Sequence, residues 1–483
     1  MFGDYQRRTG YLSYVSLIIF FLAASFIFDL RQLSLFCNAI LIVGALTGVY
    51  GLAQHFKHDF IQWNNPYNSV LSTLGNPDFA AALMAIFLVL NFGIAIQKQY
   101  VAWARGFAMF NVGLLFVVIK FSQVRQGILV AILGIAVIAI VWIYQRSKGS
   151  AYFVSGLAFF AGILAILGML NKGPFSKYFY KISVTYRGDY WRAGWRMFIH
   201  NPYFGVGLDR YGANFRQYRD ATQSLRRGPM LVSNAAHNVP IQLAATGGIF
   251  VLITFLTLSC FILCRGIIAL RNSKGAEQIT TTVIFAAWLS YEAQSLISID
   301  NLGIAIWGYI LGGAVVGISV ANKPGRASPQ KSTILQPLVS STFALVLLTV
   351  SVLFFGSESA MKTLNSHQPP QSQSGIADYE VLAEKPLSFV FKEPTFAVTI
   401  AGDLAQVHDF RKAITNLQNI IAADPKNYDA KEILARIYEY QKNFYAAAEI
   451  RGSMVRLDPY NQSLKFQLAS DEHSAQSPQT EGK

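Results

Sequence analysis

The sequence predicts an all-α protein, a polytopic transmembrane helical bundle of about ten spans with a large basic loop and a C-terminal helical domain. Three observations support this prediction. The mean hydropathy of the 483 residues is +0.36. Apolar runs near the ~20 residues that cross a bilayer core recur through most of the chain. Towards the C-terminus, residue types recur at a period of 34.

Residues 1–355 form the predicted membrane domain. Six apolar runs precede the basic loop and four follow it, so the loop and the N-terminus are expected on the same side of the membrane. The ten runs are Tyr11–Phe28, Leu33–Ala53, Phe79–Ile96, Ala104–Phe121, Gly127–Tyr144, Ala151–Leu170, Val239–Cys264, Ile279–Ile297, Leu302–Val320 and Ile334–Phe355.

The basic loop, residues 171–236, concentrates the charge of the chain. Between Asn171 and Met230, eleven Lys and Arg residues stand against three Asp residues, a net +8 of the +14 carried by the whole chain. Tyrosines and tryptophans are interleaved with them. Arginine binds phosphate bidentately, and aromatic rings stack on sugars or lie at headgroup level. The pattern suggests a lipid-linked, phosphate-bearing glycan, although single surface arginines also bind anionic headgroups.

The distribution of charge in the short loops predicts the orientation. The loops opposite the basic loop carry ten Lys and Arg residues, whereas the short loops on its own side hold little beyond Lys57, Lys120 and Arg125. Positive charge favours the cytoplasmic side. We therefore expect a multi-pass protein of the cytoplasmic (inner) membrane with an extracytoplasmic basic loop. Arg7 and Arg8 count against this orientation, and a missed or absent first helix would reconcile them.

The C-terminal part is also expected outside the cytoplasm. Residues 356–393 are rich in Ser, Gln and Pro, which indicates a linker. In residues 394–470, Phe410 recurs as Phe444 and Asp424 as Asp458, at the period and with the residue types of tetratricopeptide repeats. Two such repeats are fewer than usually stand alone, so packing on the membrane domain or on a partner is expected. The domain is either a structural cap or a docking surface for an envelope-assembly protein.

Neither a metal nor another cofactor is expected. The three cysteines, Cys37, Cys260 and Cys264, lie within predicted spans without a companion His or carboxylate in the span that holds the pair. No Asp-x-Asp pair occurs to clamp a diphosphate through a metal. Arginines would then have to neutralise a leaving diphosphate.

Within the basic loop, residues 186–197 have apolar side chains at helical spacing, which predicts an amphipathic helix on the membrane. The segment Asn201-Pro202-Tyr203-Phe204-Gly205-Val206-Gly207 then ends that helix with turn residues. The loop finishes at His237-Asn238, where the next span begins.

The pattern of Arg187, Trp191, the Asn201–Gly207 segment, His237-Asn238 and Gly247-Gly248 resembles the O-antigen ligase and polymerase family. The Gly75-Asn76-Pro77 segment and the boundary near Arg125 also fit, over roughly Leu33 to Val320. Gln123-Val124 departs from the tight Ser-Arg-Gly expected there.

The resemblance implies transfer of a glycan from an undecaprenyl-diphosphate-type carrier to a lipid, glycan or protein acceptor. The transfer would take place at the outer face of the cytoplasmic membrane. It implies His237 as the base, because an unperturbed His with a pKa of ~6.5 suits removal of a hydroxyl proton. Arg187 and Arg125 would hold the diphosphate. The expected substrate-binding residues are Trp191, Arg192, Arg196, Arg210 and Asn238. For His237, hydrogen bonding to lipid headgroups is the alternative.

Other functions stay open. A ligase and a repeat-unit polymerase look alike in sequence. A lipid-linked glycan transporter would place charges within spans, whereas here most charges lie in loops. A scaffold for envelope assembly would leave the basic loop and His237 without a role. Membrane lipids are expected partners, and nucleic acid is not.

Overall fold

The computed structural model describes the following residues: 3, 7–28, 30–61, 63, 70–321, 345, 352, 356, 358–366, 373–388 and 394–476. All regular elements in these ranges are helices. The chain divides into two compact units. The first comprises Met1–Tyr211 and Ser233–Arg326, and the second comprises Gly212–Val232 and Ala327–Lys483.

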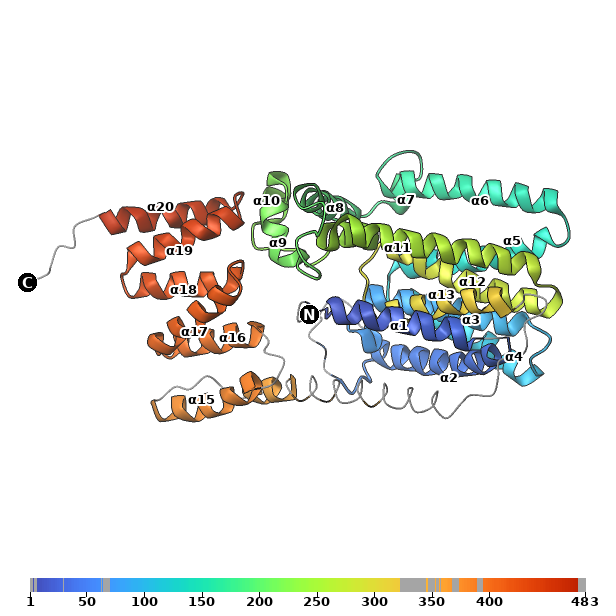
Figure 1. Cartoon of the computed structure of the whole chain (residues 1–483), viewed down its shortest axis with the longest axis horizontal. Helices are drawn as coiled ribbons and strands as arrows, with labels where there is room; N and C mark the ends of the chain where they lie inside the picture. Colours follow the sequence, from blue (N-terminus) through green and yellow to red (C-terminus); the bar gives the residue numbers. More distant parts are fainter. Residues whose placement is uncertain are drawn as a thin grey trace, which may run out of the picture. The chain divides into compact units, whose positions relative to one another are not determined.

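The first unit is a bundle whose long helices lie side by side (Figure 1). Its helices are α1 (Tyr11–Ile27), α2 (Leu30–His55), the short 3-10 helix η1 (Ser72–Leu74), α3 (Pro77–Ile96), α4 (Ala102–Phe121), α5 (Arg125–Tyr144), α6 (Lys148–Met169), α7 (Ser176–Phe179), α8 (Ile182–His200), α11 (Val239–Asn272), α12 (Gly275–Ser295) and α13 (Leu302–Ala321).

Helix α3 forms the centre of this bundle. It packs against α2, α4, α5 and α12, and every side chain from Ala80 to Asn91 is buried. A helix that is apolar on all sides is stable only when neighbours surround it. Helix α6 is the opposite case, because Phe153 and Phe159 are 74% and 72% exposed. Such a surface is suited to lipid contact.

Seven helices in the described ranges are long and apolar enough to cross a membrane, namely α2–α6, α11 and α13. They support a multi-pass membrane protein, but the predicted ten spans are not confirmed. Helix α1 has only 17 residues, and α12 contains polar residues such as Thr280–Thr282 and Glu292. The predicted span Ile334–Phe355 lies outside the described residues except for two positions.

The N-terminal segment lies at the same end of the bundle as the basic loop. The backbone N–H of Thr9 donates to Asp209 Oδ2 at 3.0 Å, and the Arg7 side chain donates to Asn234. The idea that a first helix is absent was wrong, because α1 is present and packs along α13. Arg7 is used in a local contact with the loop.

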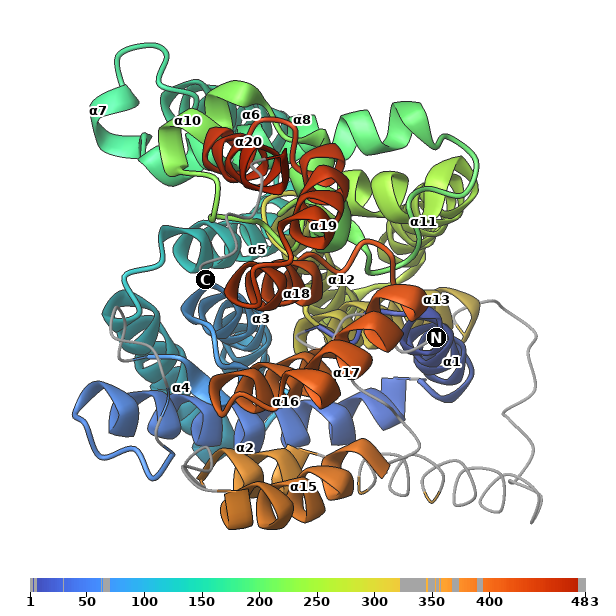
Figure 2. The ribbon, with the colours of Figure 1, turned by 90° about the vertical axis from the view of Figure 1, so that its left-hand side faces the viewer.

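The second unit combines the middle of the basic loop with the C-terminal helices. The loop contributes most of α9 (Tyr211–Tyr218) and α10 (Ala221–Arg227). The C-terminal part contributes α15 (Gln373–Ser388), α16 (Pro394–Gln406), α17 (Phe410–Ala423), α18 (Tyr428–Tyr440), α19 (Phe444–Leu457) and α20 (Gln462–Gln476). Helices α16 to α20 follow one another as a stack in both views (Figure 1; Figure 2).

The starts of these helices repeat. Helices α17 and α19 begin 34 residues apart, as do α18 and α20. Asp or Asn side chains cap all four, since Asp409, Asn427, Asn443 and Asn461 accept from backbone N–H groups of the first turn. The predicted membership of the tetratricopeptide class stays a prediction.

Candidate functional site

A cavity of about 570 Å³ opens in the first unit among α3, α5, α7 and α8. Four cationic side chains line it, together with a single carboxylate, Asp78. The cations are Lys120, Arg125, Lys181 and Arg187. Another part of the wall is apolar and includes Ile128, Leu129, Ile132 and Met169. The cavity therefore offers both a positive surface and an apolar one.

Arg187 on α8 is held in this wall by long contacts. Its Nη2 lies 3.8 Å from Asp78 Oδ2 and 3.4 Å from Gln126 Oε1, and its side chain is 16% exposed. Burial lowers the pKa of the Arg187 guanidinium, and the charge of Asp78 opposes that change. A guanidinium has five N–H donors. These two contacts leave it with capacity to bind an anion.

Asp78 owes its place to the Gly75-Asn76-Pro77 segment. Gly75 adopts a positive φ of 67°, Asn76 caps α3 by accepting from the backbone N–H of Asp78 at 2.9 Å, and Pro77 is the first helical residue. The motif thus starts α3 beside the cavity and points its first carboxylate towards Arg187.

Arg125 is the first residue of α5, where the helix dipole disfavours a cation. Its Nη1 donates to the Tyr178 carbonyl at 2.6 Å, and α5 has no acidic residue in its first turn. An anion beside a helix N-terminus is stabilised by the free backbone N–H groups. Helix stability alone therefore does not favour an arginine at this position.

His237 does not line this cavity. Its ring stacks on Tyr190 with centroids 5.2 Å apart, and Tyr190 follows Arg187 by one turn of α8. A second, smaller cavity is lined by His237 together with Arg7, Tyr14 and Asp300. Tyr190 therefore connects the predicted base with the cationic wall.

Asp300 is a buried carboxyl group in that smaller cavity. Burial raises its pKa to about 7, and the Tyr291 hydroxyl, which donates to Oδ1 at 3.2 Å, acts in the opposite direction.

Asn238 has a structural task in this structure. Its Oδ1 accepts from the backbone N–H of Ile241 at 2.9 Å, which caps α11. Its Nδ2 donates to the Leu296 carbonyl at 2.8 Å. Both contacts fix the start of α11, and with it the neighbouring His237.

The two glycine motifs meet in the structure. Helix α11 is kinked at Gly248, where φ is 73° and ψ is −167°. The Pro202–Gly207 segment fills the break through three backbone hydrogen bonds: Ile249 N–H to Pro202 O at 2.7 Å, Val206 N–H to Ala245 O at 2.9 Å and Gly207 N–H to Thr246 O at 3.0 Å. A Cβ on Gly248 would lie 2.1 Å from Tyr203 O. The chains approach this closely because there is no side chain at Gly248.

The other predicted substrate-binding residues do not line the cationic cavity. Arg192 pairs with the buried Asp189 at 2.5 Å, and its side chain is 52% exposed. Trp191 and Arg196 are half-buried on α8, and Arg210 is exposed. Their predicted role is untested.

The structure adds Asp78, Lys120 and Lys181 to the candidate site. Lys120 and Lys181 were visible as charges in segments expected on the outer side, but nothing in their local sequence ranked them above other cations. In the described ranges, no group of three His, Cys, Asp or Glu side chains could hold a metal ion.

Comparison with known proteins finds a family model that matches part of the chain. Residues 110–256 match the model of the family described as O-Antigen ligase. This stretch includes Arg125, Arg187 and His237 and is shorter than the resemblance expected from the sequence. No curated protein matches the chain. The match supports a membrane enzyme of the O-antigen ligase or polymerase type.

Proposed function

We propose that the protein is a membrane glycosyltransferase of the ligase kind, which moves a glycan from a polyprenyl diphosphate to an acceptor hydroxyl. The reaction takes place at the outer face of the cytoplasmic membrane. The donor's diphosphate binds the cationic wall of the 570 Å³ cavity, and the first isoprene units lie along its apolar wall.

The co-occurrence of four cations with an apolar wall carries the proposal. A headgroup-binding surface needs only exposed cations, whereas Arg187 is recessed and its side chain is 16% exposed. Arginine at the N-terminus of α5 and backbone N–H groups there suit phosphate oxygens. The family match covers Arg125, Arg187 and the apolar wall of α5.

The chemistry follows from charge and proton balance. The acceptor oxygen forms a bond to the anomeric carbon, and the bond between that carbon and the diphosphate oxygen breaks. Arg125 and Arg187 stabilise the negative charge that develops on the leaving diphosphate. The acceptor proton passes to His237, whose ring stacks on Tyr190 of α8, one helical turn after Arg187. Asn238 positions His237 by capping α11.

A repeat-unit polymerase of the same family is the second candidate, since its donor and leaving group are identical. The two differ only in the acceptor. The transporter alternative is less well supported, because the cations gather in one cavity at the ends of α4, α5 and α8.

The test is the extracytoplasmic glycan profile of a strain that lacks the protein, complemented with wild type, Arg187→Ala or His237→Ala. Arg146→Ala is the matched control, because Arg146 follows the opposite end of α5 and is exposed. We expect wild type and Arg146→Ala to restore the glycan and the other two to fail at normal membrane levels. Accumulated full-length lipid-linked chains identify a ligase, and single repeat units identify a polymerase. Full complementation by both site variants contradicts the proposal.

A further inference from the structure

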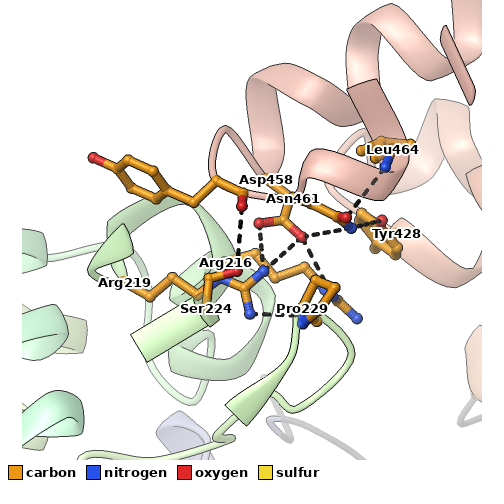
Figure 3. Close-up of polar contacts among 9 residues, drawn as sticks. Arg216, Arg219, Ser224, Pro229, Tyr428, Asp458, Asn461 and Leu464 are labelled. Carbon is orange, nitrogen blue, oxygen red and sulfur yellow. Dashed lines mark hydrogen bonds and ion pairs between the residues drawn. The ribbon is translucent and has the colours of Figure 1, made fainter. Parts of the chain in front are cut away.

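Two arginines of the basic loop are committed to a protein contact within the second unit. Arg219 on the loop donates from Nη2 to both carboxylate oxygens of Asp458, at 2.6 and 2.8 Å. Arg216 Nη1 lies 3.5 Å from Asp458 Oδ2. Figure 3 shows both guanidinium groups converging on this one carboxylate. The side chains of Arg219 and Asp458 are fully buried.

Further contacts make the surface around Asp458 a binding site for the loop. Arg216 lies over the Tyr428 ring at 3.9 Å. Ser224 Oγ donates to the Tyr460 carbonyl at 3.3 Å, and Lys426 Nζ donates to Asn214 Oδ1 at 2.6 Å. The loop and the C-terminal helices are therefore joined by ionic, cation–aromatic and neutral polar contacts.

Contacts within the loop itself also orient the two arginines. Arg216 and Arg219 each donate from Nη1 to the Pro229 carbonyl at 3.0 Å. The turn at Pro229, which follows α10 in the same loop, therefore holds both side chains in place. A buried carboxylate without a cation is costly. Asp458 therefore requires a positively charged partner.

All of helix α9 except its first residue belongs to the second unit. It begins at Tyr211, which is buried and donates its hydroxyl to the Tyr190 carbonyl at 2.6 Å. Tyr190 in turn stacks on His237. A change in the position of α9 would thus act on the residue that supports the predicted base.

We propose that the surface of α18–α20 centred on Asp458 is a docking site whose occupant is the α9–α10 segment of the same chain. The C-terminal domain thereby positions the loop, and through Tyr211 and Tyr190 it positions His237. Arg216 and Arg219 serve this docking and do not bind the glycan donor. The positioning claim rests on the proposed transferase function, whereas the docking claim does not.

The experiment uses the full chain with its three cysteines replaced and Ser224→Cys introduced, because Ser224 is 3% exposed. The rate of maleimide labelling at position 224 reports undocking. Asp458→Asn is compared with Glu432→Gln, a matched control on α18 whose ion pair with Arg436 lies at the surface. Glycan transfer by the same variants is measured in the cysteine-free background that keeps Ser224.

We expect Asp458→Asn to raise the labelling rate about tenfold or more, since it leaves the buried Arg219 and the half-buried Arg216 without their carboxylate. Glu432→Gln leaves the labelling rate unchanged. The double variant Arg219→Gln/Asp458→Asn is labelled more slowly than Asp458→Asn alone, which separates the pair from general unfolding. Transfer falls in parallel with undocking.

Labelling that is unchanged in Asp458→Asn overturns the docking. Faster labelling with undiminished transfer overturns the positioning of His237. If wild type shows no transfer at all, the transferase function fails, and the labelling result still decides the docking claim.

Discussion

Replacing Gly248 with alanine tests whether the kink in α11 holds the candidate site together. At this position φ is 73° and ψ is −167°, a region open almost only to glycine. A side chain there costs about 1–3 kcal/mol of backbone strain. The new Cβ would also lie 2.1 Å from Tyr203 O, so the Pro202–Gly207 segment has to move.

The displaced segment makes three backbone hydrogen bonds across the kink. Each contributes about 0.5–1.5 kcal/mol. With the strain, and with relaxation preserving part of the contact, Gly248→Ala is expected to destabilise the first unit by about 3–5 kcal/mol. For a unit of this size, the thermal midpoint falls by on the order of 5–10 °C.

The assay is thermal unfolding of purified protein in detergent, followed together with glycan transfer. Gly156→Ala on α6 is the matched control, since no atom lies within 4 Å of its Cβ position. Alanine there leaves the midpoint unchanged or slightly raised. A Gly248→Ala protein with native midpoint and native transfer would refute the reasoning about the kink.

Three further changes have defined outcomes. Asn238→Ala removes the cap of α11 and lowers stability by about 1 kcal/mol, and a thermal midpoint equal to wild type would argue against the cap. The native state keeps the proton of Asp300 up to a pKa of about 7, above its ordinary 3.8, so this group's stabilisation is lost as pH rises from about 4 to 7. Asp300→Asn is expected to abolish this fall of stability with pH. If the thermal midpoints of wild type and Asp300→Asn change in parallel with pH, the raised pKa of Asp300 is contradicted. Arg451→Met breaks a buried ion pair with Asp471 and costs about 3–5 kcal/mol. Hydrogen exchange in α20 should rise, whereas Arg451→Met/Asp471→Leu should restore protection.

The sequence predicts the long helices well, because a bilayer selects apolar runs of a narrow length. It misses the length and kink of α11, since glycine is tolerated in helices of membrane proteins and does not by itself mark a break. It also counts α12 as a span, and this remains unconfirmed, because α12 is not among the helices that are long and apolar enough by composition.

The cavity could be predicted only in part. Arg125 and Arg187 were assigned a role through their resemblance to a family, and the structure places both on one cavity. Their neighbour Asp78 comes from another helix, and hydrophobic periodicity does not say which helix ends meet. His237 was expected with the arginines, but it does not line their cavity and instead stacks on Tyr190.

Arg216 and Arg219 show the limit most clearly. In the sequence they add to the net charge of the loop and are indistinguishable from phosphate-binding arginines. Their partner, Asp458, is 239 residues from Arg219. No local pattern carries that pairing, so the sequence could not show that Asp458 neutralises part of the loop's positive charge.

The most direct test of the account is the affinity of the purified protein, in lipid nanodiscs, for a polyprenyl diphosphate. Wild type, Arg125→Ala/Arg187→Ala and the control Arg146→Ala are compared. Each charged hydrogen bond to phosphate contributes about 1.5–3 kcal/mol, so the double variant should bind at least about a hundredfold more weakly, while Arg146→Ala matches wild type. Equal affinity of all three proteins would contradict the assignment of this cavity to the donor diphosphate.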